Sequence, residues 1–188
     1  MAIKIFIDQG HNPKNPNAGA EANGLREQDV TYEVGRQLAQ LLRQSGNYEV
    51  RLSRNSPSET LGTTNASSLA ARTRAANDWG ADYFISIHAN ASNITSATGS
   101  EGYVYSLDSA ATPLAEQIVA GISEQTGFPD RGVFARPTLY VLRRTAMPAT
   151  LIEIGFITNP AEAYLMESDP SSYARGMYRG INRFFGFA

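Results

Sequence analysis

Residues 83–88 read YFISIH, a near-continuous apolar run that predicts a strand buried by helices on both of its faces. Residues 3–8 (IKIFID) are similarly rich in β-branched and aromatic side chains and predict a second buried strand. Between them, residues 26–44 carry apolar side chains near helical spacing, and Ser-Gly-Asn at 45–47 supplies a stop signal. Strands that alternate with helices in this way indicate an α/β domain.

The other segments extend this pattern to a sheet of about six strands with helices on both faces. Further strands are predicted at residues 48–53, 102–106, 139–142 and 150–154, and further helices at 68–79, 113–126 and 170–185. Residues 54–67 are rich in Asn, Ser, Thr, Pro and Gly, which favours a surface loop. The strands in the middle of the chain look antiparallel, so the expected sheet is mixed.

The composition limits the number of domains and the kinds of partner. A chain of 188 residues with 42% apolar residues can build one sizeable core, so residues 1–188 are expected to form one domain. Lys and Arg number 16 against 18 Asp and Glu, and this balance predicts no binding to nucleic acid or to an anionic membrane. Because cysteine is absent, any metal must be held by His, Asp or Glu.

The start of the chain carries no recognisable targeting signal. Three residues after Met1 the strand pattern is already under way, with no charged segment followed by a long apolar one. No stretch approaches the roughly 18 consecutive apolar residues that a membrane span needs. The sequence therefore reads as a bare domain without a secretory signal.

Polar side chains stand at the ends of three predicted strands. His11 follows the first strand, His88 ends the strand at 83–88, and Glu153 ends the strand at 150–154. In open α/β sheets, ligands bind beyond the carboxyl ends of the strands, so these side chains are candidates for one site. Taken singly, each histidine reads better as a hydrogen-bonded structural residue, and Glu153 has an ion pair with Arg143 or Arg144 as its structural alternative.

The residue types in this group suit zinc. A catalytic zinc usually has three His or carboxylate ligands and an open fourth position, so the two histidines of the chain need one carboxylate more. Glu27 lies in the first turn of the first predicted helix, where the helix dipole alone would also favour it. Glu21 and Asp29 are weaker candidates for the same role, and no short metal motif such as HExxH decides between them.

Nearly the whole chain resembles a known family, the zinc-dependent N-acetylmuramoyl-L-alanine amidases of the type-3 class, which includes sporulation autolysins and phage endolysins. The segments that carry the resemblance are IDQGH at 7–11, GLRE at 24–27, LSR at 52–54, LAAR at 69–72, AN at 76–77, SIHANA at 86–91, RGV at 131–133, VLR at 141–143 and PATLIEIGFITN at 148–159. They follow one another in the order the family shows, which makes accidental similarity implausible.

The resemblance implies that His11, Glu27 and His88 bind zinc and that Glu153 is the catalytic carboxylate rather than a ligand. It favours a structural role for Arg72 and Asn77, and a substrate contact for Asn90. One departure is visible, because the first histidine is usually followed by glycines, whereas Asn-Pro and the stretch 14–17 stand here. This departure concerns the shape of the groove beside the zinc.

The expected reaction is hydrolysis of the amide bond between N-acetylmuramic acid and L-alanine in bacterial peptidoglycan. The alternatives are a zinc peptidase that cuts within the peptide stem and a catalytically silent wall-binding module. The polar segment 89–100 has no apolar face that could cover the zinc, so a monomer that needs no activator protein is expected. Without a signal, the chain would act on the wall after release by lysis, or as a domain of a longer secreted protein.

Overall fold

The computed structural model describes residues 2–187 and shows one six-stranded sheet with the order β4-β1-β5-β8-β6-β7. The strands are β1 (Ile3–Gln9), β4 (Tyr48–Leu52), β5 (Tyr83–Asn90), β6 (Ser100–Val104), β7 (Asp130–Ala135) and β8 (Ala149–Phe156). Two short strands, β2 (Glu21–Ala22) and β3 (Leu25–Arg26), pair antiparallel in a separate ribbon.

The sheet is mixed, as expected. Strands β4, β1, β5 and β8 are parallel, β6 runs antiparallel to β8, and β7 runs parallel to β6. The carboxyl ends of β1, β5 and β8 therefore lie at one edge of the sheet, together with the amino ends of β6 and β7. This arrangement brings residues from both halves of the chain to the same edge.

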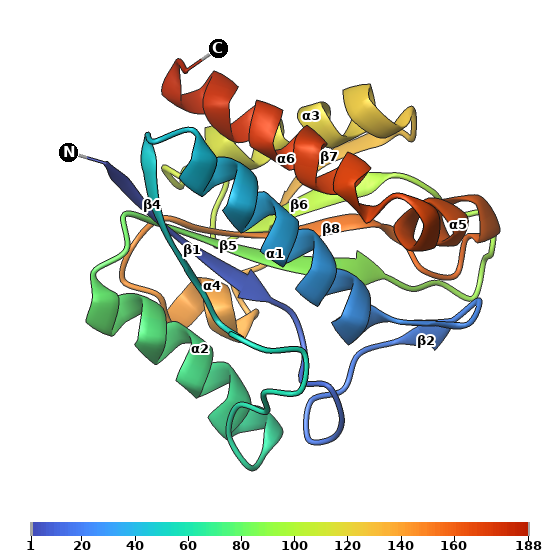
Figure 1. Ribbon diagram of the computed structural model, residues 1–188, viewed down its shortest axis with the longest axis horizontal. Helices are drawn as coiled ribbons and strands as arrows, with labels where there is room; N and C mark the ends of the chain where they lie inside the picture. The colour runs from blue at the N-terminus through green and yellow to red at the C-terminus, as the bar shows by residue number, and fades with distance from the viewer. Residues whose placement is uncertain (1, 188) are drawn as a thin grey trace.

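Helices cover both faces of the sheet (Figure 1). They are α1 (Glu27–Gln44), α2 (Asn65–Trp79), α3 (Thr112–Thr126), α4 (Tyr140–Arg144), α5 (Pro160–Ser168) and α6 (Pro170–Phe185). The larger apolar core lies between the sheet and α1, α3 and α6, and a smaller core lies between the other face and α2 and α4. Within residues 2–187 no helix combines the length and the apolar character that crossing a bilayer requires.

One sequence-based expectation about the elements is wrong, and one strand of the sheet was not expected. Residues 139–142, expected to form a strand, lie at the start of α4, which buries Val141 and Leu142 in the smaller core on the α2 side of the sheet. The sixth strand is instead β7, an edge strand whose side chains are mostly exposed and whose apolar signal is weak. The segment 54–67 is largely the expected surface loop, apart from the fully buried Arg54, whose Nη2 donates to the carbonyl of Gln28, and residues 65–67, which begin α2.

The most extensive packing between two helices joins α3 to α6, and three glycines lie at the contact. A Cβ on Gly121 would overlap the carbonyl oxygen of Gly176, and a Cβ on Gly180 would overlap the carbonyl oxygen of Gln117. The two helix backbones can therefore approach only because these positions lack side chains. Because α3 covers β6 and β7 while α6 also packs on α1, this contact ties the two halves of the larger core together.

We expect Gly180→Ala to lower the free energy of unfolding by about 1–3 kcal/mol, because the added methyl group forces two packed backbones apart. Urea unfolding followed by circular dichroism measures the change. Arg179→Ala, at the exposed neighbouring position, is the control and should stay within about 0.5 kcal/mol of the parent protein. Equal stability of Gly180→Ala and Arg179→Ala would contradict the close-approach argument.

Candidate metal centre

Two strands and one helix end bring His11, His88 and Glu27 together. His11 lies two residues beyond the end of parallel strand β1 and has a left-handed backbone conformation (φ 67°). His88 lies near the end of the adjacent β5, where a bulge follows. Glu27 is the first residue of α1 and is buried. The three side chains thus come from segments that are far apart in the sequence.

Their ligand atoms converge on one point. Nε2 of His11 lies 3.1 Å from Oε1 of Glu27, and Nδ1 of His88 lies 3.0 Å from the same oxygen. One ligand atom from each residue lies within 4.8 Å of the others, so the group can hold a metal ion. The candidates Glu21 and Asp29 do not join it, since Glu21 is exposed on β2 and Asp29 pairs with Arg26.

The backbone holds the Glu27 carboxylate in place. Its Oε2 accepts a hydrogen bond from the N–H of Ala20 (2.9 Å), and its Oε1 accepts one from the N–H of Ala89 (3.1 Å). Burial alone would raise the pKa of Glu27, but the hydrogen bonds and charges of the two histidines outweigh it and hold this pKa well below its usual value. Glu27 is therefore an ionised, fixed acceptor between the two imidazoles.

Two glycines leave the space that the cluster occupies. A Cβ on Gly10 would lie 2.6 Å from Cε1 of His88, and a Cβ on Gly19 would lie 2.7 Å from Oε2 of Glu27. Both distances are shorter than a non-bonded contact of a Cβ atom, so any side chain at these positions would push a member of the cluster aside. Gly19 belongs to the segment after His11, where the sequence departs from the usual glycines.

A buried ion pair lies beneath the cluster. Arg72 is 1% exposed, and its Nη1 donates to Oδ1 of Asp8 (2.6 Å) while its Nη2 donates to the backbone carbonyl of His11. Burial raises the pKa of Asp8, but the Arg72 guanidinium and a hydrogen bond from Ser86 more than compensate, so this pKa is lowered. The pair fixes the turn that presents His11. Asn77, farther along α2, bonds the backbone at Arg144 and Ala146.

Glu153 stands next to the cluster with no partner of its own. It is aligned with His88 across the β5–β8 pair, and its Oε2 is buried without a hydrogen bond. Burial raises its pKa well above the usual carboxyl value, and repulsion from Glu27 and Glu101 adds to the effect. Among the described residues it forms no ion pair with Arg143 or Arg144, the structural alternative that its sequence position allowed.

The sequence reasoning missed Glu101, which faces Glu153 across the β6–β8 pair. Glu101 is 7% exposed and accepts hydrogen bonds from Asn90 (2.7 Å), the Tyr103 hydroxyl (2.6 Å) and Arg131 (3.0 Å). The side-chain amide of Asn90, which is expected to contact substrate, therefore donates its hydrogen bond to this carboxylate. The available signal was a charged residue inside the apolar strand pattern of β6, beside Gly102.

A small cleft of about 150 Å³ opens beside the cluster on the α2 and α4 side of the sheet. Its lining includes His11, His88, Leu69, Tyr140 and Leu151. Asp8, Asn17 and Arg72 add polar groups to the two imidazoles in this lining. A small substrate group can thus enter next to the candidate metal ligands.

The fold is that of a known amidase catalytic domain. The catalytic domain of the N-acetylmuramoyl-L-alanine amidase CwlV from Paenibacillus polymyxa superposes with a TM-score of 0.85 and 27% identity, covering 99% of both chains. The sequence model of a family described as N-acetylmuramoyl-L-alanine amidase matches residues 5–183. The chain belongs to this N-acetylmuramoyl-L-alanine amidase family.

Similar relatives carry the same activity in their names. The chain is 40% identical over 190 residues to the N-acetylmuramoyl-L-alanine amidase CwlM of Bacillus licheniformis, covering 99% of this chain and 70% of the relative. It is 36% identical over 189 residues to a sporulation-specific N-acetylmuramoyl-L-alanine amidase of Bacillus subtilis, covering 97% of this chain and 68% of that protein.

Proposed function

We propose that residues 1–188 form one catalytic domain, which uses zinc to hydrolyse the amide bond between N-acetylmuramic acid and L-alanine in peptidoglycan. The observation that carries the proposal is the convergence of His11, His88 and Glu27 on one point beside the unpartnered carboxyl group of Glu153. Membership of the amidase family supports the choice of bond. The wall is then reached after release by lysis, or as part of a longer secreted protein.

The donor set fits zinc. Two imidazole nitrogens and one carboxylate oxygen, held by backbone N–H groups, match the three protein ligands of a catalytic zinc site that keeps a position open. Zinc bound there would supply a water of lowered pKa, about 7, and a Lewis acid for the scissile carbonyl. With no cysteine in the chain, a softer thiolate site is ruled out.

Glu153 is suited to move the proton. Its pKa is raised above the usual carboxyl value, which suits a group that takes a proton from the attacking water and then gives it up again. The acceptor of that proton is the leaving nitrogen of L-alanine, because an amide is a poor leaving group until it is protonated. Neither histidine is free for this task when both act as ligands.

The loop 91–99, which follows the second histidine, supports an enzyme that works as a monomer without an activator protein. Its backbone and side chains are tied to the α5 side of the molecule through Ser92 to Thr158, Ala97 to Asn159 and Thr98 to Glu162. The side chains of His11 and His88 keep 20% and 19% of their surface exposed. The site is therefore reachable from solvent without moving this loop.

The zinc assignment predicts the metal content of variants. Purified protein should hold one zinc ion, and His11→Ala, Glu27→Ala and His88→Ala should each lose it, because two ligands hold zinc far less well than three. Atomic emission of dialysed protein measures the metal, and circular dichroism checks the fold. Asp29→Ala removes the surface partner of Arg26, two residues after Glu27, and is the control that should keep its zinc. Full zinc content in all three ligand variants would reject the site.

The role of Glu153 predicts a split between binding and turnover. Glu153→Gln preserves the shape of the side chain but cannot carry the proton, so kcat should fall by about 10²–10⁴-fold. Zinc content should remain that of the parent protein. A zinc-loaded Glu153→Gln protein that hydrolyses peptidoglycan at the parent rate would assign the proton transfer to another group.

The digestion products test the reaction itself. Purified cell walls treated with the protein alone should release stems with a free L-alanine amino group, and no new reducing sugar ends, in mass spectra of the products. Cleavage inside the stem would indicate a peptidase, and intact walls would indicate a silent wall-binding module. A requirement for an added protein would contradict the proposed independence from an activator.

A further inference from the structure

Part of the sheet next to Glu153 is not covered by any helix. Side chains of Glu101 and Tyr103 lie on the sheet face that also carries Glu153, and Phe134 of β7 is aligned with Tyr103. Tyr105 directly follows the end of β6. The apolar core on this face includes α2 and α4, which pack over β1, β5 and β8. Tyr105 and Phe134 keep 50% and 41% of their surface exposed. An aromatic strip thus leads away from the site.

The reaction gives this strip a direction. The group that protonates the leaving nitrogen must come within hydrogen-bond reach of it, so the amine side of the scissile bond faces Glu153. The histidine ligands belong to β1 and β5, whereas Glu153 lies on β8 and has β6 and β7 beyond it. The amine side of the substrate is the peptide stem, which therefore points toward β6 rather than toward β1.

Two arginines without carboxylate partners lie along this path. Cζ of Arg136 lies 5.1 Å from the centroid of the Tyr103 ring, and Arg143 lines a hollow of about 350 Å³ together with Tyr105 and Leu142. Neither arginine forms an ion pair with a carboxylate of residues 2–187, whereas Arg131, nearer to the metal edge, pairs with Glu101. The arginine charge nearest Glu153 is therefore neutralised by Glu101, whereas the charges of Arg136 and Arg143 are not neutralised by a carboxylate of residues 2–187.

We propose that the peptide stem lies along the open face of β6 and that Arg136 and Arg143 bind its carboxylates. The inference rests on the proposed amidase function. An extended stem advances about 3.3 Å per residue, so its first few residues span Tyr103 and reach the hollow beside Tyr105. Arginine binds carboxylates through paired N–H donors, and the exposed rings of Tyr105 and Phe134 offer apolar surface to the stem backbone.

The test compares stems that differ only in charge. Muramoyl peptides with free stem carboxylates and the same peptides with these carboxylates amidated are the substrates. The parent protein should prefer the acidic form, and Arg136→Gln/Arg143→Gln should lose about tenfold in kcat/KM on that form while changing little on the amidated one. The two single variants show how the effect divides between the arginines.

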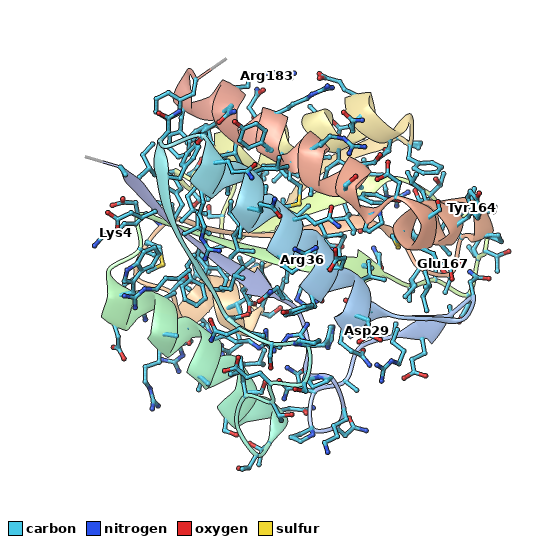
Figure 2. All side chains as sticks on the ribbon, viewed as in Figure 1. Lys4, Asp29, Arg36, Tyr164, Glu167 and Arg183 are labelled. Carbon is cyan, nitrogen blue, oxygen red and sulfur yellow. The ribbon has the colours of Figure 1, made fainter. Side chains whose placement is uncertain are left out.

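Arg36→Gln is the matched control. Arg36 lies on α1, the helix on the opposite face of the sheet (Figure 2), and pairs with Glu33 at the surface. It should leave the preference for the acidic stem unchanged. A double variant that keeps the parent preference, or that loses activity equally on both substrates, would overturn the proposed stem path.

A binding measurement separates this inference from the amidase function. Calorimetry with the free tripeptide L-alanyl-D-glutamyl-L-lysine, an amine product of the reaction, should show weaker binding to the double variant than to the parent and Arg36→Gln proteins. If the parent protein cuts no wall substrate but this difference remains, the amidase proposal fails and the stem site stands. If walls are cut and the tripeptide binds all three proteins equally, the stem site fails alone.

Discussion

The buried Arg72 guanidinium is the interaction on which the rest of the site depends. Arg72 is 1% exposed and reaches from α2 to the buried Asp8 carboxylate on β1 and to the backbone carbonyls of Gln9 and His11. A buried charge left without its partner costs about 3–5 kcal/mol, so neither member can be exchanged alone. The first histidine, whose left-handed backbone is uncommon for a residue with a side chain, is thereby held in one position.

Negative charge is concentrated along this edge of the sheet. The carboxyl groups of Glu27, Glu153 and Glu101 come from α1, β8 and β6, and they differ in their hydrogen-bond partners. Glu27 is bonded to two imidazoles and two backbone amides, and Glu101 is satisfied by Asn90, Tyr103 and Arg131. Glu153 alone has an unsatisfied oxygen. Environment, more than residue type, therefore distinguishes a candidate metal ligand, a structural acceptor and a candidate proton carrier among three glutamates.

Sequence patterns predicted the parts of this protein whose physics is local. The runs IKIFID and YFISIH are apolar because helices bury both faces, and the histidines and Glu153 are visible as polar residues at strand ends. The pattern could not separate Glu27 from Glu21 and Asp29, because that choice depends on how α1 meets the sheet.

Glu101 was not predicted as part of the site because its partners, from β5, β6 and β7, meet only in the folded chain. Short apolar runs such as LYVL at 139–142 suit helix or strand equally, and the packing of Val141 and Leu142 decided for helix. Helix α5, also missed, begins with Asn159 as its cap and Pro160 in its first turn, a start signal that the sequence does contain.

The order in which the site is assembled along the chain has a consequence for synthesis. All three candidate metal ligands precede residue 90, whereas Glu153 arrives on β8, and α6 closes the larger core later still. A chain emerging from the ribosome therefore presents all three candidate metal ligands before β8, which carries Glu153, has been made. The group of four side chains is complete only once β8 has inserted between β5 and β6.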